Sequence, residues 1–173
     1  MSRNFSIRLR STCSDDLDFV LAAENHAENI PYIRQWQRRR HEDAIASDDE
    51  AHFIIETDAS HAVGYAILQD LTSPDGCLML RRLVITEKGQ GYGKQALQLL
   101  MQQAFEVHGA HRLWLDVKTD NHRAKTLYTQ AGFVHEGCLR ESMKNSTGYS
   151  SMDIMGLLHP EYLRQQPLKT SPS

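Results

Sequence analysis

The chain has 173 residues and a mass of 19.7 kDa, a size that fits one domain with one sizeable hydrophobic core. Hydrophobic residues make up 40% and charged residues 24% of the chain, which is ordinary for a soluble globular protein. A formal net charge of -3 argues against the class of nucleic-acid-binding proteins, so we expect no nucleic-acid partner.

Membrane, secretion and metal signals are not found in the sequence. No apolar run approaches the roughly 20 residues of a membrane span, and the first five residues lack the apolar core of a signal peptide. Cys13, Cys77 and Cys138 are too few and too far apart for a disulfide framework or a zinc ribbon. The histidines form no H-E-x-x-H pair. We therefore expect a cytoplasmic protein with no membrane contact and no metal.

The first half of the chain predicts a strand, two helices and a hairpin. Residues 5–10 alternate apolar with polar side chains, as a half-buried strand does. Ser14 or Asp15 caps a first helix, and a second helix that includes Trp36 is expected to follow Pro31. A polar turn then joins two antiparallel strands, 51–57 and 63–71.

The second half predicts a buried strand and two amphipathic helices. Residues 77–85 are apolar except at Arg81 and Arg82, which is typical of a strand covered on both faces. After a glycine-rich loop, apolar residues recur at helical spacing through residues 97–105. The remaining predicted elements are a strand at 111–117, a helix that begins at Asn121, and two long strands at 134–143 and 148–157.

This order of elements predicts an α/β fold. Because strands outnumber helices and helices connect some of the strands, we expect a single mixed, mostly antiparallel sheet of about six to seven strands, with helices on both faces. We expect one domain over residues 5–160 and a flexible C-terminal tail over 161–173, where Pro167 and Pro172 oppose regular structure.

The loop Lys88–Gly93 lies between the buried strand and the first of these amphipathic helices. Its three glycines allow a tight turn and a close approach of the backbone to a ligand. The free N–H groups and the dipole of the following helix favour a phosphate, and Lys88 and Lys94 add positive charge. The loop therefore predicts a site for a pyrophosphate.

Two common phosphate-binding motifs do not fit this loop. A P-loop needs Gly-Lys followed by Ser or Thr, whereas Gly93-Lys94 is followed by Gln95. The dinucleotide fingerprint G-x-G-x-x-G has another spacing and belongs at the end of a first strand. Taken alone, the loop fits an ordinary glycine turn as well as it fits a cofactor site.

Two motifs together resemble those of a known superfamily. The spacing Lys88-x-x-Gly91-x-Gly93 resembles the acetyl-CoA signature [Q/R]-x-x-G-x-[G/A] of the GCN5-related N-acetyltransferase (GNAT) superfamily. The run 121–133 is similar to that family's second segment, N-x-x-A-x-x-L-Y-x-x-x-G-F. The resemblance covers roughly residues 5–160 and looks closest to the ribosomal-protein acetyltransferase-like branch.

The resemblance implies the GNAT fold, an N-acetyltransferase activity and acetyl-CoA as the cosubstrate. It implies that Tyr128 is the catalytic acid that protonates the leaving thiolate, and that Asn121 contacts the pantetheine arm. The residues that it assigns to cofactor binding are Leu83, Val84, Ile85, Lys88, Gly89, Gln90, Gly91, Tyr92, Gly93, Lys94, Asn121, Ala124 and Lys125.

The sequence departs from the family pattern at the general base. Related sequences often have an acidic residue near the position of Met79, and this chain does not. Four other carboxylates remain candidates for the general base: Glu24, Asp70, Asp116 and Glu141. That none of them acts as the base also stays open. Without a strong base, an amine of low pKa is favoured, because neutralising a lysine-like amine at pH 7 costs on the order of 4–5 kcal/mol.

The expected reaction is direct attack of a primary amine on the thioester, with a backbone N–H near Val84 stabilising the oxyanion. The acceptor is expected to be an amine-bearing small molecule or a protein N-terminus, selected around Ile30–Tyr32 and Trp36. Two alternatives stay open: a non-catalytic CoA-binding or regulatory module, and a binder of nucleotide phosphates. A homodimer through the apolar strand 152–158 is also possible.

Overall fold

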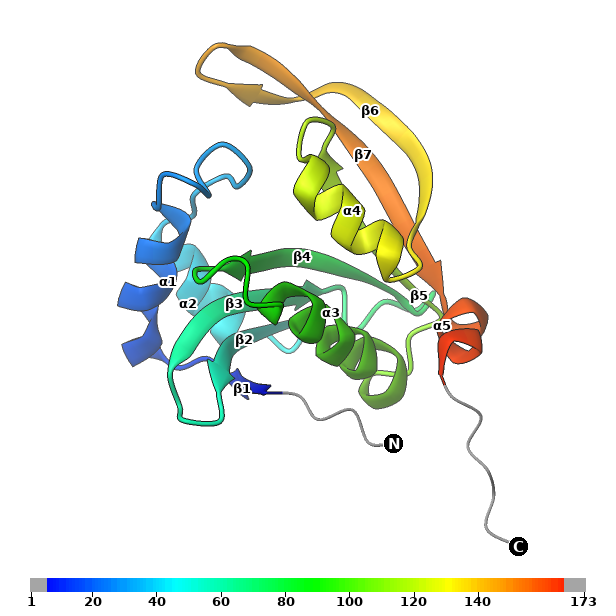
Figure 1. Ribbon diagram of the computed structural model, residues 1–173, viewed down its shortest axis with the longest axis horizontal. Helices are drawn as coiled ribbons and strands as arrows, with labels where there is room; N and C mark the ends of the chain where they lie inside the picture. Colours follow the sequence, from blue (N-terminus) through cyan, green and yellow to red (C-terminus); the bar gives the residue numbers. More distant parts are fainter. Residues whose placement is uncertain (1–5, 167–173) are drawn as a thin grey trace, which may run out of the picture.

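The computed structural model describes residues 6–166. One sheet contains all the strands, in the order β1-β2-β3-β4-β5-β7-β6 (Figure 1). Its strands are β1 (Ile7–Ser11), β2 (Glu50–Thr57), β3 (Ala62–Gln69), β4 (Cys77–Ile85), β5 (Arg112–Lys118), β6 (Val134–Asn145) and β7 (Gly148–Leu158). The helices are α1 (Leu17–Glu24), α2 (Arg38–Ala46), α3 (Tyr92–Gln102), α4 (His122–Gln130) and α5 (His159–Gln165), with a short 3-10 turn before α1 and a π-helical turn after α3.

The predicted fold class is confirmed. All strand pairs are antiparallel except β4 with β5, so the sheet is mixed and mostly antiparallel. The predicted hairpin is β2 and β3, which are paired along their length with one register shift between Ile55 and Glu56. The β6–β7 hairpin extends away from the rest of the molecule (Figure 1).

Helices cover the two faces of the sheet with separate apolar clusters. The larger cluster joins α3, α4 and α5 to one face and includes Leu97, Leu113 and Tyr128. The smaller cluster joins α1 to the opposite face through Leu17, Val20 and their neighbours. Leu113, Leu115 and Val117 alternate along β5, and all three lie on the face that the larger cluster buries.

Part of the second predicted helix is wrong. The chain from Asn25 to Gln37 forms turns and irregular structure, and α2 begins only at Arg38. A helix that starts after Pro31 and includes Trp36 needs the main-chain groups of this segment for its own hydrogen bonds. Here distant side chains take those groups: the carbonyl oxygen of Pro31 accepts from Lys118, and the N–H of Trp36 donates to the carboxylate of Glu24.

The predicted C-terminal boundary is also corrected. The tail was expected to begin at residue 161, but helix α5 continues to Gln165. Tyr162 is 1% exposed, stacks on Phe105 with ring centroids 4.8 Å apart and donates a hydrogen bond to Glu106. These buried contacts hold the helix on the larger core cluster, and the rest of the predicted tail, 167–173, lies outside the described residues.

Strand β7 does not have the free edge that an interface strand would need. It lies between β5 and β6 and pairs with both. Met155 and Leu157 are buried in the larger core cluster, which explains the apolar run by packing within the chain. An interface through residues 152–158 is therefore not supported by the fold.

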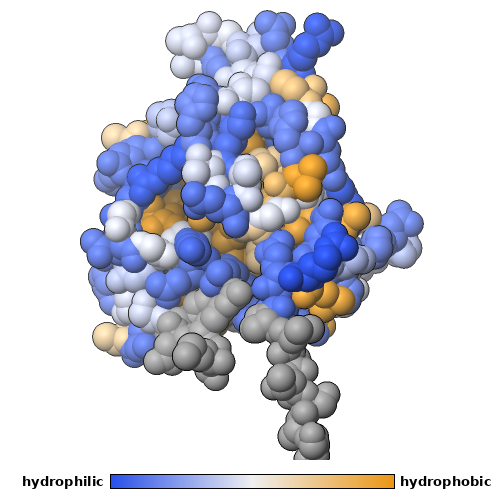
Figure 2. All heavy atoms as spheres, turned by 45° about the vertical axis from the view of Figure 1, so that its right-hand side comes forward, coloured by the Kyte–Doolittle hydropathy of each residue, from blue (hydrophilic) through white to orange (hydrophobic). Residues whose placement is uncertain are grey.

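The surface is mostly hydrophilic on the face that Figure 2 shows, with apolar side chains gathered in a recess. Among the helices of residues 6–166, none combines the length and the apolar composition that crossing a bilayer requires.

Candidate active site

A cleft of about 980 Å³ opens where β4 and β5 separate. The two parallel strands pair only from Cys77 to Met79 on β4, opposite Arg112 to Trp114 on β5. Beyond these residues the strands diverge, and the walls of the cleft come from both of them, from the loop 25–37, from the N-terminal part of α3, from α4 and from the β6–β7 hairpin. The cleft thus joins segments that are far apart in the sequence.

The glycine-rich loop forms one end of this cleft. Gly89 and Gly91 have φ angles of 83° and 78°, in the left-handed region that favours glycine, and Gly91 is the N-cap of α3. The first hydrogen bond of that helix runs from the N–H of Gln95 to the carbonyl of Gly91, at 3.2 Å. The N–H groups of the preceding residues therefore remain free to bind an anion, as the sequence predicts.

Most of the predicted cofactor residues line the cleft, but two do not. The residues that do are Leu83, Val84, Ile85, Lys88, Gly89, Gly91, Tyr92, Gly93, Lys94, Asn121 and Ala124. Gln90 is exposed and lies outside the lining. Lys125 also lies outside it, because its ammonium group pairs with Asp153 at 2.6 Å.

Tyr128 reaches the cleft from α4. The residue is only 9% exposed, and its ring packs against Phe133 with centroids 5.8 Å apart. Burial raises the pKa of its phenol, and the negative charge of Asp116 raises it further. The hydroxyl therefore keeps its proton through the neutral range and is suited to act as a proton donor.

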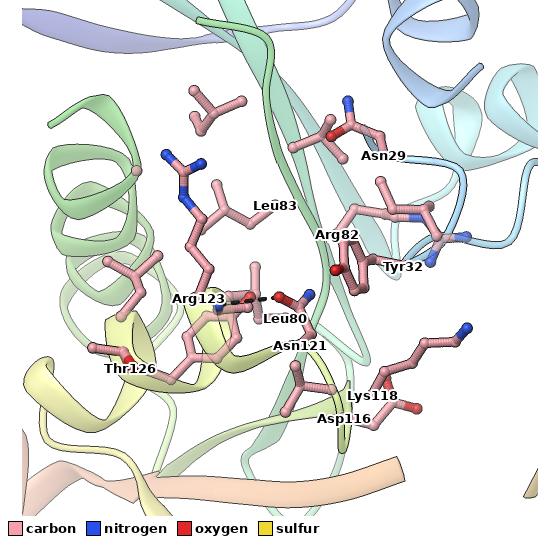
Figure 3. A pocket seen from close by; sticks show the side chains of 18 of the residues that line it. Asn29, Tyr32, Leu80, Arg82, Leu83, Asp116, Lys118, Asn121, Arg123 and Thr126 are labelled. Carbon is pink, nitrogen blue, oxygen red and sulfur yellow. Dashed lines mark hydrogen bonds between the residues drawn. The ribbon is translucent and has the colours of Figure 1, made fainter. Parts of the chain in front are cut away.

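Asn121 caps α4 beside this tyrosine. Its side-chain oxygen accepts a hydrogen bond from the N–H of Ala124 at 3.2 Å, which is drawn as a dashed line in Figure 3. The capping function that the sequence allows for Asn121 is thus present. The cap holds the first turn of α4 against the cleft, where Arg123 and Thr126 also line it.

Of the four candidate carboxylates, only Asp116 lines the cleft. It lies on β5 at the point where the strands have separated, and Figure 3 shows it together with Lys118 from the same strand. Asp70 and Glu141 are exposed residues with positive φ that lie elsewhere. Glu24 is 0% exposed and does not line the cleft.

Glu24 instead belongs to a buried polar cluster behind the cleft wall. Its carboxylate accepts hydrogen bonds from the hydroxyl of Tyr65 at 2.5 Å and from the N–H of Trp36 at 2.8 Å. Burial by itself would raise the pKa of this carboxyl, but the hydrogen bonds from His41, Tyr65 and Trp36 lower it overall. Glu24 therefore stays ionised and fixes the end of the loop 25–37.

Two cationic side chains hold the same loop from the sheet. Arg82 on β4 donates to the carbonyl of Arg34 at 2.7 Å, and Lys118 on β5 donates to the carbonyl of Pro31 at 2.6 Å. Between these two contacts, Tyr32 points into the cleft from the loop (Figure 3). The sequence places the acceptor site near Ile30–Tyr32, but it contains no signal for the two anchoring cations.

Comparisons with known proteins agree with this geometry. Residues 18–133 match the family model described as the acetyltransferase (GNAT) family. The spermidine N(1)-acetyltransferase of Vibrio cholerae is 22% identical over 173 residues, which cover 94% of this chain and 98% of that protein. The enzyme of the same name from Escherichia coli K12 is 25% identical over 171 residues, which cover 92% and 90% of the two chains.

Solved structures show the same fold. The spermidine N-acetyltransferase of Vibrio cholerae in complex with CoA and spermine has a TM-score of 0.84 at 22% identity, over 92% of this chain and 99% of that one. A dodecameric structure of the Vibrio cholerae enzyme has a TM-score of 0.79 at 21% identity, over 94% of this chain and 100% of that one.

The relatives named here are spermidine acetyltransferases, so the finer assignment to a ribosomal-protein branch is off, whereas the superfamily is confirmed. The matched family model covers two thirds of the chain, including both cofactor motifs up to Phe133. The chain belongs to the acetyltransferase (GNAT) family and is an N-acetyltransferase that uses acetyl-CoA as its cosubstrate to acetylate an amine.

Proposed function

We propose that the enzyme acetylates a small-molecule primary amine, and that the reaction takes place in the cleft between β4 and β5. The observation that carries this proposal is the meeting of two motifs in the walls of one cleft. The glycine-rich loop lines the cleft before α3, and Tyr128, from the second motif, lines it from α4.

The pantetheine arm of acetyl-CoA is proposed to bind along β4 at Leu83, Val84 and Ile85. Among residues 6–166, β4 has no strand partner on its β5 side beyond Met79. Main-chain polar groups on such an edge need partners, and the amides of pantetheine are suitable partners. The main-chain groups of Val84 face β3, so by alternation along the strand those of Leu83 and Ile85 face the open side. One of these two N–H groups would then face the thioester carbonyl and stabilise the oxyanion.

The diphosphate is proposed to bind at the loop Gly89–Lys94. The free N–H groups at the start of α3 supply hydrogen bonds, and Lys88, Lys94 and Arg123 supply positive charge at this end of the cleft. Lys88 also pairs with Glu28 at 3.1 Å, which places its charge beside the loop. Gln90 adds at most a main-chain contact, because it lies outside the cleft lining.

Tyr128 and Asp116 are proposed to move the protons. Tyr128 donates a proton to the leaving thiolate. Burial in the same apolar environment also favours the neutral thiol over the charged thiolate. Asp116 attracts the ammonium form of the acceptor and takes its proton, directly or through water, before the amine attacks. This assignment gives each of the two groups one step of the reaction.

The names of the relatives support a small-molecule acceptor over a protein N-terminus, because the curated relatives are spermidine acetyltransferases.

The dodecameric relative supports a homo-oligomer for this chain as well. On this chain, β6 is one of the two edge strands of the sheet and exposes Val134, so it is the proposed contact strand. Light scattering after size exclusion measures the assembly.

The activity is tested with a mixed library of mono- and polyamines, acetyl-CoA and the purified protein. Mass spectrometry should find acetylated amines, and the release of free thiol should keep pace with them. Calorimetry should show that acetyl-CoA binds. Binding of acetyl-CoA without any product from the library would favour the non-catalytic CoA-binding module and overturn the proposed function.

A further inference from the structure

The charged residues of the cleft differ between its two ends. At the cofactor end, Lys88, Lys94 and Arg123 line the cleft, and they match the phosphates of CoA. At the end formed by the loop 25–37, Lys118, Arg82 and Arg34 line it, and Asp116 is the carboxylate beside Lys118 (Figure 3). Arg81, which precedes Arg82 on β4, also lines the cleft. A polyamine would bring several positive charges to this second end.

The other carboxylates that line the cleft are already paired. Glu28 pairs with Lys88 at 3.1 Å, and Glu87 lies 2.5 Å from the imidazole of His61. Within residues 6–166, no ion pair involves Asp116. Asp116 is therefore the one lining carboxylate left to bind an ammonium group, and a single carboxylate neutralises a single ammonium.

Lys118 makes this end unfavourable for a second positive charge. The residue is only 9% exposed, and its ammonium group donates to the carbonyl of Pro31 at 2.6 Å. No carboxylate of the described chain lies within ion-pair distance of it. Its only hydrogen-bond partner in the described chain is thus a carbonyl dipole, and its charge, with Asp116 two residues away on the same strand, acts on any cation that enters the cleft beside it.

Arg82 occupies a carbonyl oxygen of the loop that could otherwise accept a hydrogen bond from a ligand's ammonium group. Its guanidinium donates to the carbonyl of Arg34 at 2.7 Å, with the buried Glu24 at 3.8 Å behind it. Carbonyl oxygens of a loop are natural acceptors for a ligand's ammonium group. The carbonyls of Pro31 and Arg34 accept from protein cations instead. Between them in the chain, Tyr32 is 43% exposed and presents an aromatic ring.

We infer that the acceptor carries no positive charge other than the amine that is acetylated, and that Lys118 is the residue that excludes polyamines. This inference rests on the proposed function. The reacting ammonium lies at Asp116, and the rest of the molecule, neutral or bearing a carboxylate, lies against Tyr32 and the side of the cleft that contains Lys118. The inference separates this chain from its relatives that are named for spermidine.

Three amines with the same five-carbon chain test the inference. Pentylamine ends in a methyl group, 5-aminopentanoate in a carboxylate and 1,5-diaminopentane in a second ammonium. At pH 7.5 and low salt, kcat/KM for the diamine should be about tenfold below that for pentylamine, because the second ammonium meets Lys118. A value for the diamine equal to or above that for pentylamine would overturn the inference.

Lys118→Gln should raise the ratio of kcat/KM for the diamine to that for pentylamine towards one, whereas Lys118→Arg should keep the ratio of the parent enzyme. Loosening of the loop alone would lower both rates and leave the ratio unchanged, so the ratio reports charge. Arg39→Gln is the matched control, since this side chain is 83% exposed, pairs with Asp43 on α2 and lies outside the cleft lining.

The same amine library separates the two proposals. Acetylated products that carry no further ammonium group support both. Products in which polyamines dominate would overturn the inference about Lys118 and leave the acetyltransferase proposal intact. No product from any amine would overturn the proposed function and the inference together.

Discussion

Tyr128 is buried and is also the proposed proton donor of the reaction. Its phenol is buried beside a carboxylate, and both conditions raise its pKa. We predict that Tyr128→Phe lowers kcat by about 100-fold, because a positioned acid contributes rate of this order. The dissociation constant of acetyl-CoA, measured by calorimetry, should stay unchanged. A variant with the turnover of the parent enzyme would remove Tyr128 from the mechanism.

Asp116 gives a second prediction at this scale, which depends on the pKa of the acceptor. Asp116→Asn should lower kcat/KM for pentylamine at pH 7 by about 100-fold, because a charged alkylamine then loses its proton acceptor. Raising the pH to 9.5 should restore most of this loss, since more of the amine is neutral in solution. A loss that is the same at both pH values would assign Asp116 a purely structural function.

At the scale of elements, α2 and β2 are joined by a buried pair of histidines, His41 and His52. The ring nitrogens of His41 and His52 lie 3.1 Å apart, and His52 also contacts the hydroxyl of Thr12 at 2.9 Å. Burial lowers the pKa of His52 from its usual 6.5 to about 4, and the neighbouring His41 adds to this effect. His52 is therefore neutral in the folded protein at pH 5.5, where the unfolded chain is protonated.

This difference sets the direction of a pH dependence. The unfolded state binds more protons than the folded state between about pH 6.5 and 4, so the stability that His52 contributes is complete above pH 6.5 and lost as the pH falls. We predict a loss of about 1 kcal/mol in the free energy of unfolding between pH 7.5 and 5.5, measured with urea. His52→Asn should show a smaller difference between the two pH values.

The contact of β3 with β4 depends on a glycine. A side chain at Gly64 would collide with the carbonyl oxygen of Val84, which belongs to the strand that forms the cleft. Gly64→Ala should therefore destabilise the fold by about 2 kcal/mol, because a main-chain atom must move. It should also weaken acetyl-CoA binding, since the strand that shifts is the one proposed to hold pantetheine. Equal urea midpoints for variant and parent would contradict this.

At the scale of the whole molecule, α5 joins the end of the chain to the core. Tyr162 is buried between β7 and the segment after α3 and stacks on Phe105. We predict that Tyr162→Ala lowers the free energy of unfolding by about 3–5 kcal/mol, the usual cost of deleting a large buried aromatic side chain. Thermal unfolding measures this change, and Tyr149→Ala is the control, since that tyrosine is exposed on the β6–β7 hairpin.

Much of the architecture was predictable because it depends on local patterns. Local patterns predicted the strand at 111–117 and the hairpin of β2 and β3, and the two motifs at 88–93 and 121–133 indicated the family. The start of α2 was not predictable. The segment from Pro31 to Trp36 was predicted to start the helix, but Lys118 and Glu24, which are distant in sequence, bind the main-chain groups of Pro31 and Trp36. Local propensity gives way where tertiary hydrogen bonds are stronger.

For the active site, too, some features follow from local sequence and others from tertiary packing. The sequence by itself determined the family, the cosubstrate and the segment that carries Tyr128, because cofactor motifs are contiguous in the chain. Only the tertiary structure decided which carboxylate faces the cleft and which cations surround the acceptor. Asp116, Arg82 and Lys118 lie on two strands that diverge, and the distances between such strands follow from packing, which no short stretch of sequence specifies.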